Sequence, residues 1–180
     1  MKEIAIEDLT LNPFTVFGRD WMALAVGNEQ DGCNAMTVSW GQLGELWERS
    51  SHSNRLPTAV CYVRPSRYTK AWMEREKMFT LCHFDGSHKK ALGYLGSHSG
   101  RDGDKLAAAG LTPVFEFGTV YPAEADLVFI CRKLYSQDLE DACFADRKIV
   151  DFNYPERDFH TMYIGEIMKV LKREENSNER

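Results

Sequence analysis

Residues 34–41 read NAMTVSWG, a stretch in which polar and apolar side chains alternate. On a pleated strand alternate side chains share a face, so Met36, Val38 and Trp40 would lie on one side and Thr37 and Ser39 on the other. One interpretation is an amphipathic strand whose apolar face packs on the core. The other is a strand laid edge-on to a planar ring, whose polar rim would bond to backbone N–H groups and to the two hydroxyls. The residues alone leave both interpretations open.

Similar short runs, rich in β-branched and aromatic residues, recur along the chain and are separated by turn residues. The predicted strands cover residues 21–26, 35–40, 58–63, 78–83, 114–121, 127–134 and 162–171. Most of them have no helical crossover between them, which favours antiparallel pairing. The sequence therefore predicts a mainly β fold, a barrel with a few short helices outside it.

Three short helices are expected between these strands. Each would begin after a polar N-cap residue, and the last two would end at a glycine. The expected helices are residues 67–75 after Ser66, residues 88–95 between Ser87 and Gly96, and a segment between Asp102 and Gly110.

Length and charge limit the classes of protein that the chain can represent. The 180 residues are predicted to form one domain over residues 1–172, followed by a polar tail over residues 173–180. The net charge of −5 argues against a nucleic-acid partner, because such proteins usually carry a basic stripe. No apolar run approaches the roughly 20 residues that span a bilayer, and the acidic N-terminus is unlike a signal peptide. We therefore expect a cytoplasmic protein without membrane contact.

Cysteine and histidine spacing predicts no metal site. The five cysteines are far apart and form no C-x-x-C pair, which also argues against a disulfide framework. Cys61, Cys82 and Cys131 lie in apolar stretches, where a thiol usually behaves as a small buried hydrophobe. The five histidines form no H-E-x-x-H motif, and no G-x-S-x-G elbow marks a nucleophilic serine.

Residues 64–69, RPSRYT, follow a predicted strand and open a predicted helix. A helix N-terminus offers free N–H groups, and the two arginines and the hydroxyls add further donors. Such a segment suits a phosphate monoester. It is equally compatible with an ordinary capped helix whose arginines are solvated.

Residues 87–90 (SHKK) and 96–105 (GSHSGRDGDK) are rich in glycine and basic side chains. Neither a P-loop nor a G-x-G-x-x-G fingerprint is present, so a nucleotide site of those types is not supported. The segments could be a flexible connection between two helices, or a lid near the phosphate end of a ligand.

Taken together, these segments resemble the flavin reductase-like family of FMN-binding split barrels, which includes flavoredoxins. The matching stretches follow the family's order and cover nearly the whole chain: NAMTVSWGQLGELW, YVRPSRYT, FTLCHFDGSHKKALGYLGSHSGRDGDK, AGLTPVFEFGTVY, CRKLYSQDLEDACF and DFHTMYIGEIMKVL. The resemblance implies a six- or seven-stranded antiparallel Greek-key split β-barrel with helical excursions. It also implies homodimers with flavin sites at or near the subunit interface.

The resemblance also implies which residues bind FMN. Those expected along the isoalloxazine ring are Asn34, Met36, Thr37, Ser39 and Trp40. Those expected to hold the ribityl chain and the phosphate are Arg64, Ser66, Arg67, Tyr68 and Thr69. Those expected near the phosphate end are Lys90 and Lys105. His160 is expected beside the flavin pocket and is the one candidate for a catalytic role.

The function implied by the resemblance is that of a flavin reductase, which passes hydride from NAD(P)H to flavin and serves a monooxygenase or another redox protein. The alternative is a flavoredoxin-like electron carrier with tightly bound FMN and a protein partner, and a non-enzymatic flavin-binding module is a third hypothesis. One segment departs from the family. Residues 48–57, ERSSHSNRLP, make a longer connection, which we expect to be a mobile surface loop that could cover the flavin and change nicotinamide access.

Overall fold

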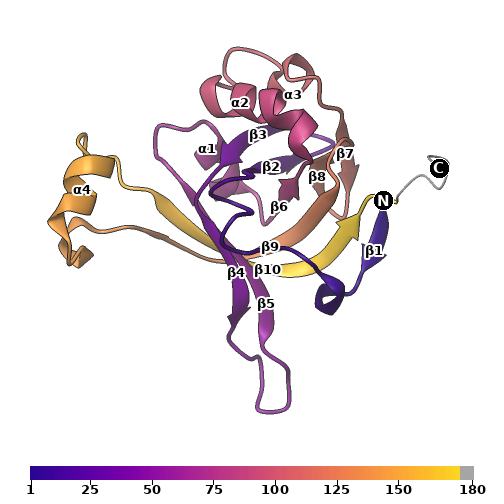
Figure 1. Cartoon of the computed structure of the whole chain (residues 1–180), viewed down its shortest axis with the longest axis horizontal. Coiled ribbons are helices and arrows are strands. Elements are labelled where there is room, and N and C mark those ends of the chain that lie inside the picture. The colour runs from indigo at the N-terminus through magenta and orange to yellow at the C-terminus, as the bar shows by residue number, and fades with distance from the viewer. Residues whose placement is uncertain (175–180) are drawn as a thin grey trace.

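The computed structural model describes residues 1–174. Seven strands form one antiparallel sheet in the order β3-β2-β6-β9-β10-β5-β4, with β1 paired to the end of β10 and a separate β7–β8 hairpin (Figure 1). The strands are β1 (Lys2–Ile4), β2 (Met22–Asn28), β3 (Gly32–Val38), β4 (Gly41–Leu46), β5 (Leu56–Val63), β6 (Met78–His83), β7 (Pro113–Glu116), β8 (Thr119–Pro122), β9 (Leu127–Asp138) and β10 (Thr161–Lys172). The helices are α1 (Thr69–Arg75), α2 (Lys89–Ser97), α3 (Lys105–Ala108) and α4 (Arg147–Asn153), with 3-10 turns η1 (Ile6–Asp8), η2 (Gly86–His88) and η3 (Asp141–Cys143).

The sheet closes on itself without a hydrogen-bonded ladder between its outer strands. β3 and β4 stand at opposite ends of the strand order, yet only Ser39 and Trp40 separate them along the chain. The three Cα–Cα steps from Val38 to Gly41 span at most about 11 Å, so the sheet must curl until these strands are neighbours. Among the described strands no ladder joins β3 to β4. The barrel is therefore split along this seam, and Ser39-Trp40 crosses it.

The alternation of side chains along the strands produces two apolar layers. On β2, Met22, Leu24 and Val26 point into the barrel, whereas Ala23 and Ala25 point outward. The outward alanines join a second cluster with side chains of α2, α3 and β8. Because alanine is small, the two helices can lie close to the sheet, and Figure 1 shows them over one end of the barrel. This packing places the helices beside β3.

The first helix begins two residues later than its predicted start. α1 starts at Thr69, its N-cap position Tyr68 makes no side-chain capping bond, and Ser66 lies in the turn before it. The prediction that Ser66 caps this helix is therefore wrong. α1 therefore begins at the last residue of the RPSRYT segment that the sequence predicts as an anion site.

The next two helical segments are capped by Asp85 and Asp104, and not by the predicted Ser87 and Asp102. The carboxylate of Asp85 accepts the Ser87 N–H and begins the η2 turn that leads into α2. Asp104 accepts the Ala107 N–H at 3.1 Å and caps α3. Both capping predictions are wrong by two residues, because a carboxylate earlier or later in the loop reaches the free N–H groups.

One predicted strand is in fact two, and one strand was not predicted. The run 114–121 is a hairpin of two strands, because Phe117 and Gly118 adopt positive φ angles of 53° and 71° and reverse the chain. β4 was not predicted, since its sequence GQLGEL carries two glycines and has weak strand propensity. β4 nevertheless forms because it pairs with β5 from Gly41–Cys61 to Leu46–Leu56.

Two extensions project away from the barrel in Figure 1, the β4–β5 hairpin and an arm that carries α4 between β9 and β10. Leu56 and Pro57, from the segment expected to be a loop, belong to β5. Arg49 in the exposed tip of the hairpin binds Glu166 of β10 through two hydrogen bonds of 2.8 and 2.6 Å. Arg132 of β9 binds the same carboxylate at 2.5 Å. These two arginines hold the pKa of Glu166 down at about 2.

The end of the chain is anchored as far as Arg173. Arg173, the first residue of the predicted polar tail, donates to the carbonyl oxygens of Ala123 and Ala125 at 2.6 and 3.0 Å. Residues 175–180 of that tail lie outside the described residues. The three cysteines predicted to be buried are fully buried free thiols. Within residues 1–174, no helix is long and apolar enough to cross a membrane.

Candidate functional site

Two cavities that share Met36 and Arg67 lie beside β3, at the seam of the barrel. We call the first, of about 220 Å³, the seam cavity. Its lining residues are Met36, Thr37, Val38, Ser39, Trp40, Tyr62, Arg64, Arg67 and His160. We call the second, of about 140 Å³, the basic cavity. Its lining residues are Asn34, Met36, Ser66, Arg67, Tyr68, Thr69, Ser97, His98, Ser99, Gly100, Arg101 and Lys105.

An aromatic wall borders the seam cavity. The ring of Trp40, which is 40% exposed, lies 4.7 Å from the buried ring of His160, and Tyr154 stands edge-on behind both. Burial, with the charge of Arg64, lowers the pKa of His160 to about 4. The imidazole is therefore neutral near pH 7 and offers one N–H and one lone pair.

The predicted hydroxyls of β3 differ in their availability. Thr37 donates its hydroxyl proton to the carbonyl oxygen of Leu92 in α2, so it can only accept a further hydrogen bond from a ligand. Ser39, at the seam, is exposed and makes no hydrogen bond through its side chain to any described residue. Of the two hydroxyls expected to bond to a ring's rim, only that of Ser39 is free to donate.

The positive charge of Arg64 is neutralised by a carboxylate of the arm that carries α4. Its guanidinium binds the carboxylate of Asp158 at 2.6 Å and the carbonyl oxygen of Asn153 at 2.8 Å, and it lies 5.2 Å from the centre of the Tyr154 ring. The ion pair lowers the pKa of Asp158. Arg64 thus joins the arm to the wall of the seam cavity, and it does not line the basic cavity where a phosphate role would place it.

Three cations and no carboxylate line the basic cavity. Lys105 is only 7% exposed, and no acidic side chain among residues 1–174 pairs with it. Arg67 donates only to the carbonyl oxygen of Gly96, at 3.0 Å, and Arg101 lies over the ring of Tyr68 at 4.8 Å. Burial, together with the charge of Arg67, lowers the pKa of Lys105 to about 8. In a chain of net charge −5, such a cluster of unneutralised cations is suited to an anion.

The floor of the basic cavity is fixed by a buried hydrogen bond. Asn34 of β3 donates its amide N–H to the Thr69 hydroxyl at 2.7 Å, and both residues are at most 2% exposed. This bond ties the start of α1 to β3. It also means that Asn34 and Thr69 support the cavity more than they offer free groups to a ligand.

The structure brings together nearly all the residues predicted from the sequence. Twelve of the thirteen line one or both cavities, and the exception, Lys90, is exposed on α2 away from them. Their binding roles stay predictions. Arg101 was missed as an individual residue, although its loop was singled out, and Tyr62 and Tyr154 were missed altogether. Strand alternation places Tyr62 two residues before Arg64 and could have identified it.

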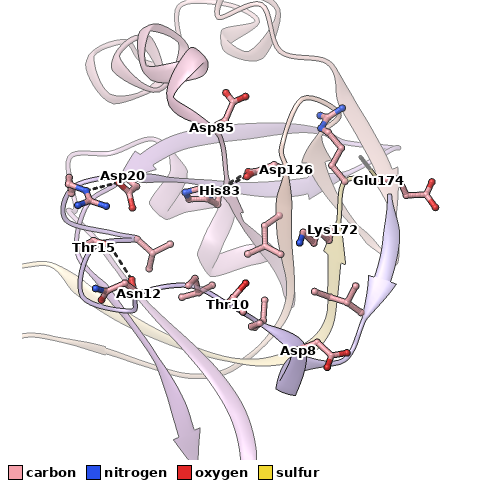
Figure 2. A pocket seen from close by; sticks show the side chains of 17 residues that line it. Asp8, Thr10, Asn12, Thr15, Asp20, His83, Asp85, Asp126, Lys172 and Glu174 are labelled. Atoms are coloured by element: carbon pink, nitrogen blue, oxygen red, sulfur yellow. Dashed lines mark hydrogen bonds and ion pairs between the residues drawn. The ribbon is translucent and has the colours of Figure 1, made fainter. Parts of the chain in front are cut away.

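A larger cavity of about 540 Å³ lies elsewhere, between the N-terminal segment and the ends of β6, β9 and β10 (Figure 2). His83 pairs there with Asp126 at 3.0 Å, and Asp20 and Asp85 lie nearby, so that the pKa of His83 is raised. Carboxylates outnumber the arginines and the lysine in its lining, unlike in the basic cavity, and none of the thirteen predicted residues lies in this cavity. Size alone therefore does not single out the basic cavity.

The family model of the flavin reductase-like domain matches residues 22–180. The chain belongs to the flavin reductase-like family. The match includes every residue that lines the seam and basic cavities. No curated protein matches the sequence significantly.

Solved structures confirm the fold of this family member. Flavoredoxin of Desulfovibrio vulgaris (Miyazaki F) superposes with a TM-score of 0.64 at 21% identity, over 97% of this chain and 78% of that chain. An FMN-binding protein from Thermus thermophilus with bound p-hydroxybenzaldehyde gives 0.63 at 17% identity, over 99% and 86%. A Streptomyces globisporus NADH:FAD oxidoreductase in complex with NAD and FAD fragments gives 0.59 at 13%, over 86% and 75%. The predicted antiparallel split barrel is thus confirmed.

Proposed function

We propose that this protein binds FMN across the seam and basic cavities and acts as a flavin reductase that takes hydride from NADH or NADPH. The observation that carries the proposal is the buried, unneutralised Lys105, set with Arg67 and Arg101 at one end of a site whose other end is walled by Trp40 and His160. A ligand with a phosphate at one end and a flat ring at the other matches this arrangement. Family membership independently supports a flavin cofactor.

The donor set of the two cavities fits FMN. Arg67, Arg101 and Lys105 would hold the phosphate, with the hydroxyls of Ser66 and Ser99 as further donors. The backbone of β3 and the exposed Ser39 would face the ring, and Met36, which lines both cavities, would lie under the link between ring and phosphate. Thr37 would serve only as an acceptor.

Bound flavin would supply the hydride acceptor, and the protein would supply binding, orientation and electrostatics. Neutral His160 and the exposed Ser39 provide uncharged polar contacts at the ring end, so that oxidised, uncharged flavin binds without an opposing charge. No protein acid or base is required for a hydride transfer, and His160, with its lowered pKa, is poorly suited to act as an acid at neutral pH.

Anaerobic addition of NADH and then NADPH to the FMN-loaded protein tests the proposed reaction. Bleaching of the flavin absorbance by either nucleotide would support a reductase and identify the donor. Flavin that resists both nucleotides but is reduced rapidly by a ferredoxin-type protein would instead favour the flavoredoxin-like carrier. Loaded protein that is reduced by neither would overturn both redox assignments.

We also infer that the active form is a homodimer, because an apolar groove of about 810 Å³ adjoins the seam cavity and shares Ser39, Trp40 and Tyr62 with it. Phe14 at the edge of this groove is 90% exposed, and Phe152 on α4 is 86% exposed. Apolar side chains at such exposure are typical of a surface that another chain covers. Sedimentation equilibrium should give twice the chain mass, and a monomer at micromolar concentration would contradict the inference.

Changing Gly100 to alanine is expected to weaken FMN binding about tenfold. A Cβ at this position would lie 2.1 Å from the amide oxygen of Asn34 and 3.2 Å from the Tyr68 ring. Since Asn34 is buried and bonded to Thr69, the loop that carries Arg101 must move instead. Flavin fluorescence titration measures the loss. Gly93→Ala, which meets no atom within 4 Å, is the matched control and should bind FMN normally.

FMN affinity should fall as the pH rises above about 8, because Lys105, whose pKa is lowered to about 8, then loses its charge in the free protein. A bound phosphate favours the charged amine, so the pKa of Lys105 rises in the complex and the affinity falls by up to tenfold per pH unit. Affinity measured from pH 6.5 to 9.5 checks this. Lys105→Arg should remove the dependence, and an unchanged slope in that variant would contradict the role of Lys105.

A further inference from the structure

Tyr154 and His160 form a buried pair behind the seam cavity. The Tyr154 hydroxyl lies 2.9 Å from Nδ1 of His160, and the two residues are 1% and 9% exposed. Phe144 and Phe159 pack on the Tyr154 ring, and the Arg64 guanidinium lies over it, so the phenol is held in place from several sides. Tyr154 comes from the arm and is far from Trp40 in the sequence, although the centres of the two rings lie 6.4 Å apart.

The position of one proton decides what His160 can do. Burial raises the pKa of Tyr154, so its hydroxyl keeps its proton at neutral pH. A buried hydroxyl proton needs an acceptor, and among the described residues the only one bonded to it is Nδ1 of His160. With Nδ1 as the acceptor the hydroxyl proton has a partner, whereas with Nδ1 as the donor that proton would have none among the described residues.

We propose that Tyr154 is a positioning residue that holds His160 in the Nε2–H tautomer, so that His160 presents an N–H donor to the ligand in the seam cavity. A neutral imidazole carries one proton, and a lone pair fixed on Nδ1 places that proton on Nε2. Nε2 has no partner among the described residues, and His160 lines the cavity. The tautomer follows from the protein alone, whereas its effect on flavin rests on the proposed function.

The groups around His160 keep this state stable over a wide pH range. Burial and the charges of Arg64 and Arg67 oppose protonation of the ring, and only Asp158, which Arg64 neutralises, favours it. The imidazole therefore stays neutral above about pH 5, and the tautomer should not change from pH 5.5 to 8.5.

A fixed Nε2–H donor favours a ligand that gains electron density. Such a donor strengthens its hydrogen bond when the acceptor becomes negatively charged, as the ring of a flavin does on reduction. Loss of the fixed tautomer should therefore weaken binding of reduced FMN more than binding of oxidised FMN. This asymmetry appears as a more negative midpoint potential of the bound flavin.

Nitrogen-15 NMR of histidine-labelled protein without added flavin tests the tautomer directly. His160→Gln identifies the His160 signals by their disappearance. The proposal predicts a protonated, pyrrole-type Nε2 and an unprotonated, pyridine-type Nδ1 at pH 7. A protonated Nδ1, or a rapidly averaging mixture in the wild-type protein, would overturn it whatever the protein does with flavin.

Tyr154→Phe tests the consequence for the site. We expect averaged His160 tautomers and a fivefold to tenfold greater loss of affinity for reduced than for oxidised FMN, which is about the size of one ordinary hydrogen bond. Tyr121→Phe, which removes a hydroxyl bound to Glu116 on the β7–β8 hairpin, is the matched control and should change neither quantity. An equal loss of affinity for oxidised and reduced FMN would show that Tyr154 contributes only packing and would contradict its role in positioning His160. Failure of the wild-type protein to bind FMN would overturn the proposed function and leave the NMR result to decide the tautomer.

Discussion

Changing Arg67 to alanine should weaken FMN binding about 10- to 100-fold while leaving riboflavin binding nearly unchanged. A hydrogen bond to a charged group contributes about 1.5–3 kcal/mol, and Arg67 lines both cavities between the ring end and the phosphate end. Calorimetric titration with the two flavins measures the difference.

The comparison between FMN and riboflavin separates a phosphate contact from general damage to the site. Arg19→Ala, which alters an exposed arginine in the N-terminal cavity, should leave both affinities unchanged. At saturating FMN the Arg67 variant should retain most of the hydride-transfer rate, because its role is binding. Equal losses for FMN and riboflavin, or loss of turnover at saturation, would show that Arg67 does not act as a phosphate ligand.

Changing Gly27 to alanine should lower the free energy of unfolding by about 3–5 kcal/mol, the sum of backbone strain and overpacking. Gly27 has a φ of +142°, and a Cβ there would lie 2.3 Å from the carbonyl oxygen of Gly32 and 2.5 Å from the Cα of Cys33. Both are backbone atoms of the β2–β3 hairpin and cannot move aside like the end of a side chain. The melting temperature should fall by at least about 6 °C.

Gly44→Ala is the matched control for this prediction. Gly44 lies on β4, and a Cβ there meets no atom within 4 Å, so its stability should change by less than about 0.5 kcal/mol. Because Gly27 lies beside the turn of the hairpin whose second strand carries Asn34 and Met36, the Gly27 variant should also lose FMN affinity. A Gly27 variant as stable as the Gly44 variant would contradict the described hairpin.

Much of the barrel could be predicted because its strands have a clear period. On β2 and β6 alternate side chains pack into two different apolar layers, so both strands appear in the sequence as short apolar runs between turn residues. The hairpin partner β4 was missed because its glycines carry little strand propensity and its pairing with β5 supplies the stability. The helix caps were misplaced because several polar residues compete within each loop, and only the folded geometry selects Asp85 and Asp104.

The sequence could predict which segments form the site, but not which of their polar side chains are free to bind a ligand. The resemblance to a family brought together the strand with Trp40 and the turn with Arg67, which the fold places in adjoining cavities. Spacing could not show that Asp158 neutralises Arg64, since these residues are 94 positions apart. Nor could it show that the Thr37 hydroxyl donates its proton to the carbonyl oxygen of Leu92. Long-range partners decide whether a polar side chain is free for a ligand.

Titration of the flavin-free protein with FMN, followed by flavin absorbance and fluorescence, tests whether the two cavities bind this flavin. We expect saturable binding of one FMN per chain, with riboflavin bound at least tenfold more weakly because it lacks the phosphate that the basic cavity would hold. Riboflavin bound as tightly as FMN would contradict the assignment of the basic cavity. No saturable binding of either flavin would contradict the proposed function as a whole.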